Sequence, residues 1–259
     1  MKHFDSHVHI GLINDDPMEQ LLVIQKTKQQ KINKMLSICN NLVDFDNVYN
    51  NLISESSVYH AVGVSPSEVV HPGKDWEQKI KERAALKNVV AIGETGLDYY
   101  RKFGDKKSQI DLFIRQLEIA DQLDLPVVIH NRDAGNDVFE IIRDKLPRRG
   151  GVLHCYSEDW NFAQKVLNNH DNLYISFAGN VTYKNARALQ NTAFNMPIER
   201  MVVETESPFM VASAHKGKRN MPFYLPATIE FLAELRNMDF EEFSNIIYQN
   251  TLNLFNINE

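Results

Sequence analysis

Apolar residues along the chain follow two alternating patterns. Short runs rich in β-branched residues, which are typical of buried strands, recur eight times. These runs span Lys2–His9, Lys34–Cys39, Tyr59–Val64, Val89–Gly93, Pro126–His130, Gly151–Cys155, Leu173–Phe177 and Met201–Glu204. Between them lie segments whose apolar residues recur with helical spacing, most clearly in Lys106–Leu123. The pattern therefore predicts strands and helices in alternation.

Further helical segments fill the intervals between the other predicted strands. They span Met18–Gln30, Asp75–Leu86, Asn136–Asp144, Asp159–Asn168 and Lys184–Phe194, with a C-terminal helical stretch from Leu225 to Phe255. Alternation of this kind without a long polar linker favours one closed (β/α)8 TIM barrel over two packed domains. The length of 259 residues also suits such a barrel. We expect a single domain over residues 1–259.

Composition narrows the class of protein. The composition, with 43% hydrophobic and 24% charged residues, is typical of a globular protein with a substantial core. A net charge of −6 argues against strong non-specific binding to nucleic acid, but leaves room for a local basic patch. Cys39 and Cys155 lie in apolar runs, so we expect buried free thiols. Without a signal-peptide pattern or an apolar run near the roughly 20 residues of a membrane span, a cytoplasmic monomer that binds no membrane is expected.

Histidines and acidic residues gather at the ends of the predicted strands, where barrel enzymes carry their catalytic groups. Five ends read Asp5-Ser6-His7-Val8-His9, Gly93-Glu94-Thr95, Ile129-His130-Asn131-Arg132, His154-Cys155-Tyr156-Ser157 and Glu204-Thr205-Glu206. Because strand side chains alternate between faces, His7 and His9 point the same way, as does Asp5, and the two imidazoles can bind one metal ion. Buried imidazoles and carboxylates cost free energy unless they are paired or metal-bound, so the pattern predicts a metal site.

The number of candidate ligands predicts two ions. Four histidines and two acidic groups exceed the three protein ligands of a catalytic zinc site. Glu94 is then the bridging ligand, with His7, His9 and residue 206 on one side and the other two histidines, His130 and His154, on the other. Two neighbouring ions clamp a substrate oxygen and lower the pKa of a bridging water, so that hydroxide is available near neutrality. Zn, Mn, Ni, Co and Mg all remain open as the metal.

Six runs of sequence are distinctive enough to compare with known families. They are Asp5–His9, Gly93–Tyr99 (GETGLDY), Pro126–Arg132 (PVVIHNR), His154–Ser157 (HCYS), Ser176–Ala186 (SFAGNVTYKNA) and Glu204–Pro208 (ETESP). In order, and over nearly the whole chain, they resemble the TatD family of metal-dependent hydrolases. The resemblance implies an amidohydrolase-like TIM barrel, dependence on divalent metal and phosphodiester hydrolysis of DNA. It also implies metal ligation by His7, His9, Glu94, His130, His154 and position 206.

Four departures from the family pattern fall on loops or strand ends that should line the barrel mouth. Glu206 stands where the family usually has Asp, and Ser65 replaces the histidine of a Gly-x-His-Pro turn. Met221 replaces the glutamate of Arg-Asn-Glu-Pro, and Glu158 replaces a glycine. The longer stem of Glu206 shifts its carboxylate by about 1.5 Å, one carbon–carbon step. Since this acid is also a candidate general base, we expect an altered rate and not lost metal binding.

Candidate substrate contacts lie near the predicted ligands. Arg132 comes two residues after His130 and shares its face, where a guanidinium can bind a phosphate through two hydrogen bonds. An ion pair with Asp98 or Glu204 is the open alternative for Arg132. Further candidates for the same pocket are Ser65, Asn131, Ser157 and Arg219.

Three classes of function fit these observations. The first is a metal-dependent phosphodiesterase or deoxyribonuclease that acts on nucleic acid or another phosphodiester, with Glu94 and Glu206 as catalytic residues. The second is a small-molecule amidohydrolase, lactonase or phosphoesterase on the same binuclear barrel. The third is a weakly active family member that retains its metal ions.

Overall fold

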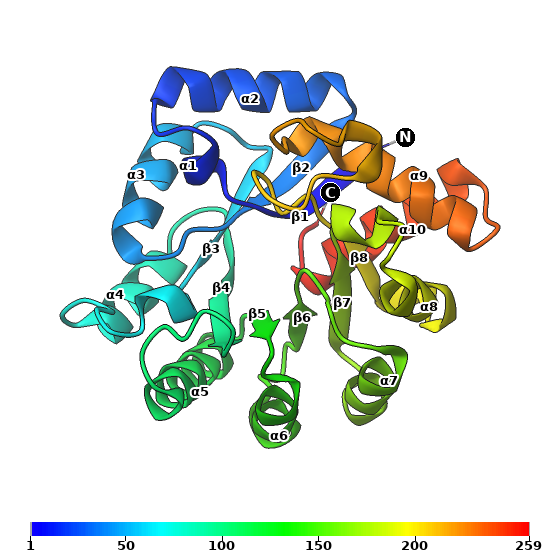
Figure 1. The fold of residues 1–259 in the computed structure, drawn as a ribbon. Coiled ribbons are helices and arrows are strands. Elements are labelled where there is room, and N and C mark those ends of the chain that lie inside the picture. The colour runs from blue at the N-terminus through cyan, green and yellow to red at the C-terminus, as the bar shows by residue number, and fades with distance from the viewer. Residues whose placement is uncertain (1, 259) are drawn as a thin grey trace.

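The computed structural model describes residues 2–258, in which eight parallel strands form one sheet in the order β1 to β8. Each strand therefore pairs with its sequence neighbours, and helices surround the strands (Figure 1). The strands are β1 (His3–Val8), β2 (Ile32–Ser37), β3 (Val58–Val62), β4 (Val89–Asp98), β5 (Val127–Arg132), β6 (Gly151–Leu153), β7 (Leu173–Phe177) and β8 (Met201–Val203). The prediction of a (β/α)8 TIM barrel is confirmed.

The helices follow the predicted alternation, with two differences. They are α1 (Ile10–Ile13), α2 (Pro17–Gln29), α3 (Leu42–Leu52), α4 (Trp76–Ala84), α5 (Lys106–Leu123), α6 (Gly135–Lys145), α7 (Trp160–Asn169), α8 (Arg187–Asn195), α9 (Leu225–Leu235) and α10 (Phe240–Leu254). The prediction did not include α1 and α3. The C-terminal stretch, predicted as continuous, is two helices, because Asp239 caps the start of α10 and accepts hydrogen bonds from the backbone N–H groups of Glu241 and Glu242.

Strand β4 is longer than its predicted extent of Val89–Gly93. It continues to Asp98, and its register with β5 shifts between the Ile92 and Thr95 pairings. Gly96, with a φ of +135°, lies so close to β5 that an added Cβ would be 2.1 Å from the carbonyl oxygen of His130. Only glycine fits at this position. Because β4 continues to Asp98, Glu94 lies inside the strand and not after its end.

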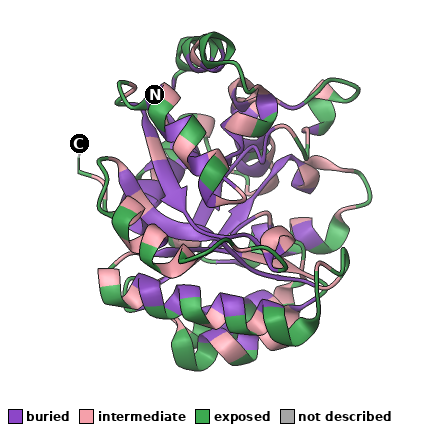
Figure 2. Cartoon of the chain, turned by 90° about the vertical axis from the view of Figure 1, so that its left-hand side faces the viewer, coloured by how far each residue is buried: buried purple, intermediate pink, exposed green. Residues whose placement is uncertain are grey.

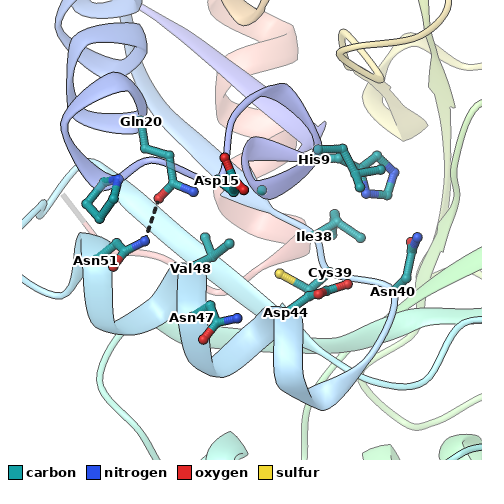
Figure 3. A pocket seen from close by; sticks show the side chains of 13 residues that line it. His9, Asp15, Gln20, Ile38, Cys39, Asn40, Asp44, Asn47, Val48 and Asn51 are labelled. Carbon is teal, nitrogen blue, oxygen red and sulfur yellow. Dashed lines mark hydrogen bonds between the residues drawn. The ribbon is translucent and has the colours of Figure 1, made fainter.

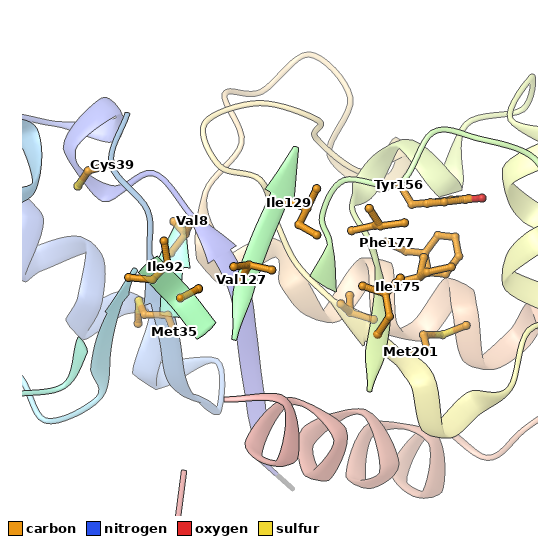
Figure 4. Close-up of a cluster of buried hydrophobic side chains, with 14 of the residues drawn as sticks. Val8, Met35, Cys39, Ile92, Val127, Ile129, Tyr156, Ile175, Phe177 and Met201 are labelled. Atoms are coloured by element: carbon orange, nitrogen blue, oxygen red, sulfur yellow. The ribbon is translucent and has the colours of Figure 1, made fainter. Parts of the chain in front are cut away.

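Apolar side chains pack on both faces of the sheet. Residues such as Ile92, Val127 and Ile175 fill the layer between the strands and the surrounding helices (Figure 4). Alternate residues, among them Val128 and Val202, turn to the other face and pack with residues of α10. In Figure 2 the strands are buried, whereas the helices expose their outer faces. The core thus leaves the C-terminal ends of the strands for polar groups.

No helix within residues 2–258 has the length and apolar character needed to cross a membrane.

Gln116 on α5 connects the outer helices to the strands that carry the site. Its side-chain oxygen accepts a hydrogen bond from the backbone N–H of Val64 at 2.8 Å. Its side-chain nitrogen donates to the Val64 carbonyl and to the Thr95 hydroxyl, both at 2.8 Å. Because Gln116 is fully buried, these partners have no access to water as a replacement.

We predict that Gln116→Leu lowers the free energy of unfolding by at least about 2 kcal/mol, because buried polar groups lose their partners. Gln122→Leu is the matched control, since Gln122 lies on the same helix and is exposed. Chemical denaturation of both variants measures the difference. A Gln116→Leu variant as stable as the control would show that these hydrogen bonds contribute little.

Candidate metal centre

The six predicted ligands meet at the C-terminal end of the barrel strands. They come from β1 and the residue after it, from β4, from β5, and from the segments after β6 and β8: His7, His9, Glu94, His130, His154 and Glu206. All except His7 line a central cavity of about 440 Å³, and His7 is fully buried beside it. The local structure has thus brought together residues from five separate stretches of chain.

Glu94 lies between two pairs of histidines. One carboxylate oxygen, Oε1, is 2.9 Å from His130 Nδ1 and 3.5 Å from His154 Nε2. The other oxygen, Oε2, is 3.7 Å from His7 Nε2 and 3.8 Å from His9 Nε2. The candidate ligand atoms of His7, His9 and Glu94 lie within 4.8 Å of one another, and so do those of Glu94, His130 and His154. Each oxygen of Glu94 therefore faces a different pair of imidazole nitrogens.

Glu206 approaches the same cluster from the segment after β8. Its Oε2 is 3.2 Å from His7 Nε2, 3.8 Å from His9 Nε2 and 3.7 Å from His154 Nδ1. Its backbone is left-handed, with a φ of 57°. Burial raises the pKa of Glu206 well above its usual value despite attraction to His154, and repulsion from Glu204 adds to the rise. The longer side chain thus reaches the first pair of histidines.

The donor set fits divalent cations. His7 Nε2 and His9 Nε2 are 3.2 Å apart, as are His130 Nδ1 and His154 Nε2. In each pair, only one of the two nitrogens can donate a hydrogen bond to the other. Within residues 2–258, the buried Oε2 of Glu206 also has no hydrogen-bond partner. Convergent lone pairs on nitrogen and oxygen are what zinc and similar ions accept. A cation in each position would satisfy groups that hydrogen bonds leave unpaired.

The pKa values of the clustered side chains depend on burial and on the charges of their neighbours. Burial by itself raises the pKa of Glu94, but the facing rings of His154 and His130 hold it well below its usual range. Burial lowers the pKa of His7 well below its usual value, and the neighbouring rings of His154 and His9 lower it further. The Glu94 carboxylate is held ionised and His7 neutral, whereas the neighbouring carboxylates outweigh burial and raise the pKa of His130 and of His154.

Two further carboxylates lie next to histidines of the cluster. Asp98 Oδ2 is 3.3 Å from His130 Nε2, the ring nitrogen turned away from Glu94. Glu204 Oε1 is 3.5 Å from His154 Nδ1, accepts a hydrogen bond from the Cys155 N–H, and lies close enough to His7, His154 and Glu206 to share a cation with them. Metal-binding histidines commonly have such carboxylate partners, which fix the ring and its tautomer. The sequence analysis considered these acids only as partners for an arginine, although their places at strand ends carried the signal.

Asp5 was not among the predicted ligands, and its carboxylate is used by Thr205. It accepts hydrogen bonds from the Thr205 N–H at 2.8 Å and from the Thr205 hydroxyl at 2.6 Å. The register of β1 with β2 shifts between Asp5 and Val8. Burial raises the pKa of Asp5 to about 7 against the opposing hydrogen bonds from Thr205. Its position ties β1 to the segment after β8.

The predicted substrate contacts divide into two groups. Arg132, Ser65, Asn131 and Ser157 line the central cavity. The Arg132 guanidinium lies 4.1 Å from the centroid of the Tyr100 ring, and among the described residues it forms no ion pair with Asp98 or Glu204. Ser65 is buried, and its hydroxyl caps the turn that follows it.

Arg219 lies outside the lining of the central cavity. It is exposed, and its guanidinium donates a hydrogen bond to the carbonyl of Leu12. A contact between Arg219 and substrate phosphates therefore stays a prediction. Three residues that the sequence analysis did not name, Arg101, Phe209 and Met210, do line this cavity.

The two cysteines are free, but only Cys39 is buried as predicted. Cys155 is partly exposed because it follows His154 at the mouth and lines the central cavity.

Comparisons with known proteins agree with this geometry. Residues 4–256 match the family model described as TatD related DNase. YabD of Bacillus subtilis (strain 168), an uncharacterized metal-dependent hydrolase, is 33% identical over 257 residues, covering 98% of this chain and 99% of YabD. YcfH of Escherichia coli (strain K12), with the same description, is 34% identical over 256 residues, covering 98% of this chain and 95% of YcfH.

Solved structures show the same architecture. The crystal structure of YJJV, a TatD homolog from Escherichia coli K12, matches with a TM-score of 0.89 at 24% identity, covering 99% of this chain and 98% of that one. A mutant organophosphorus hydrolase matches with a TM-score of 0.68 at 13% identity, covering 98% and 92% of the two chains, which is a likeness of fold alone. Since the family model spans nearly all of the sequence and full-length relatives share about a third of it, the chain belongs to the TatD family of metal-dependent hydrolases.

Proposed function

We propose that this protein is a phosphodiesterase that hydrolyses DNA with two divalent metal ions. The observation that carries the proposal is the position of Glu94, whose two carboxylate oxygens each face a pair of imidazole nitrogens. Two ions that share a carboxylate are typical of enzymes that cleave phosphate esters. The description of the matching family as TatD related DNase supports DNA as the substrate.

The ligands would divide between two positions. His7, His9 and Glu206 would hold the first ion with Oε2 of Glu94, and His130 and His154 would hold the second ion with Oε1. Two such ions polarise a phosphoryl oxygen and make water more acidic. Glu206 lines the cavity with a side chain that is 12% exposed, so it is placed to accept a proton from an attacking water.

Cationic side chains at the cavity wall suit a phosphate group. Arg101 and Arg132 both line the cavity. A guanidinium is planar and can bind two phosphate oxygens at once, and its stacking on Tyr100 limits the conformations of Arg132. These arginines supply a local positive charge that the overall charge of −6 does not exclude.

Exposed apolar side chains at the mouth favour an unpaired strand over a duplex. Phe209 is 50% exposed, lines the cavity and meets the His9 ring edge-on, with 6.2 Å between ring centroids. Tyr100 is 61% exposed beside Arg132. Aromatic side chains next to a positively charged channel bind single strands because unpaired bases stack on them.

The direct test of this function is hydrolysis of a labelled single-stranded DNA oligonucleotide by metal-loaded protein. We expect cleavage that stops with a chelator and weakens as salt rises, because phosphate contacts release counterions. A panel of small phosphoesters, lactones and amides serves as the comparison. Turnover of panel members without DNA cleavage would favour a small-molecule hydrolase, and no turnover of any substrate would favour a weakly active metal-binding protein.

We predict that elemental analysis of gently purified protein finds about two divalent ions per chain. The double variant His130→Ala/His154→Ala should retain about one, because the ligands of the first position remain. His60→Ala is a suitable control, since His60 is buried in β3 and belongs to neither group of ligands. Absence of metal from wild-type protein in metal-replete medium would contradict the proposed centre.

We predict opposite effects for two substitutions at position 206. Glu206→Asp shortens the side chain to the length usual in the family and should raise turnover of a phosphodiester without changing metal content. Glu206→Gln keeps the shape but removes the proton-accepting charge, so turnover should fall by about 100-fold or more. Steady-state kinetics with parallel metal analysis measures both. A wild-type rate for Glu206→Gln would mean that this residue is neither a base nor an important ligand.

A further inference from the structure

A second cavity of about 300 Å³ opens beside the metal centre, between the segment that follows β1 and helix α3 (Figure 3). We call it the side cavity. His9, Leu12 and Asn40 line both the side cavity and the central cavity. Because the two spaces share a wall that includes a predicted metal ligand, a molecule held at the metal centre can extend a substituent into the side cavity.

Helix α3 presents a row of polar side chains to the side cavity. Asp44, Asn47, Val48 and Asn51 line it, and their spacing of three and four residues places them on one face of the helix. Asn51 donates a hydrogen bond to the side-chain oxygen of Gln20 at 3.1 Å, which closes one end of the space (Figure 3). The polar face of α3 is thus turned toward the neighbouring segment.

Several polar groups in the side cavity keep unused hydrogen-bonding capacity. Within residues 2–258, the side chains of Asp15, Asn40 and Asn47 form no hydrogen bond or ion pair with the protein; Asp15 and Asn47 are exposed to solvent and Asn40 is partly exposed. Asp44 accepts a hydrogen bond from Asn41 on one carboxylate oxygen only. These side chains offer carboxylate acceptors together with amide donors and acceptors. A ligand in this space would find partners that the protein itself does not occupy.

The side cavity has no cationic side chain, unlike the central cavity. Its lining contains two carboxylates, Asp15 and Asp44, and no lysine or arginine. The lining of the central cavity includes Arg101 and Arg132 beside its three carboxylates. A phosphate is repelled by the carboxylates and attracted by the arginines, so it belongs in the central cavity. The side cavity suits a neutral group that donates hydrogen bonds.

We infer that the side cavity is the subsite for one nucleobase of the substrate, with a preference for bases that carry an exocyclic amino group. This inference rests on the proposed function. Asparagine side chains match the donor and acceptor pattern of a base edge, and carboxylates accept hydrogen bonds from amino groups. Apolar side chains of Ile38 and Val48 provide contacts for the ring. Thymine lacks an amino group and turns carbonyl oxygens toward the carboxylates, so it binds less well.

Nucleoside binding tests the subsite without requiring catalysis. Isothermal titration calorimetry of the metal-loaded protein should show guanosine binding at least about 10-fold tighter than thymidine, within the range for a bidentate base contact. Asn47→Leu keeps a similar volume but removes the amide, and should weaken guanosine binding by at least about 10-fold. Asn50→Leu is the matched control, because Asn50 is exposed on the same helix and does not line the side cavity.

Hydrolysis provides an independent measurement. We compare kcat/KM for a guanine-containing dinucleotide with kcat/KM for bis(4-nitrophenyl) phosphate, which carries no base. The ratio of the two should fall by at least about 10-fold in Asn47→Leu and stay at the wild-type value in Asn50→Leu. Measured metal content identifies any loss that comes from a damaged metal centre.

Four results would overturn the subsite. They are an absence of nucleoside binding, equal binding of guanosine and thymidine, equal effects of the two asparagine substitutions, and binding of methylammonium without binding of any nucleoside. If wild-type protein hydrolyses neither phosphodiester, the proposed function fails, while nucleoside titration still decides whether the side cavity binds a base.

Discussion

Closure of the barrel between its first and last strands is the constraint on which the site depends. The backbone N–H of Glu206 donates to the carbonyl of His7, and the N–H of His9 donates to the carbonyl of Ser207. Behind them, the Asp5 carboxylate accepts two hydrogen bonds from Thr205. These bonds, with that from the Ser6 hydroxyl to the Val203 carbonyl, join segments that lie about 200 residues apart in the sequence. They hold the imidazoles after β1 and the carboxylate after β8 at one point.

The polar cluster and the apolar core around it are stabilised by different interactions. Apolar packing holds the strands and helices together whether or not cations are bound. The imidazoles and carboxylates at the mouth are buried with mutual attraction and repulsion that only partly cancel, and Asp98 and Glu204 lie next to two of the rings. If these side chains are the metal ligands, as we propose, the free-energy cost of burying them is offset when cations bind.

Much of the site follows from the sequence because a barrel fixes where strands end. Once the strands were assigned, the histidines and acids at their ends had to share one face of the barrel. The sequence pattern does not predict where the backbone of a strand becomes irregular. The register of β1 shifts between Asp5 and Val8, and β4 runs through the close contact at Gly96 to Asp98, beyond its predicted end. Helix α3 escaped prediction because its Asn- and Asp-rich sequence has weak helical propensity, and only the cap at Asn41 marks its start.

The absence of a side chain at Gly96 has a consequence for how sequence changes affect this protein. An added methyl group would meet the carbonyl oxygen of His130 and push β5 away from β4. The two strands carry Glu94 and His130, so the distance between a shared ligand and its neighbour is set by a backbone contact and not by either side chain. A substitution at this glycine would leave every ligand chemically intact and yet separate them. A loss-of-function allele at position 96 would therefore have the phenotype expected for loss of one of the proposed metal ligands, although all of their side chains were unchanged.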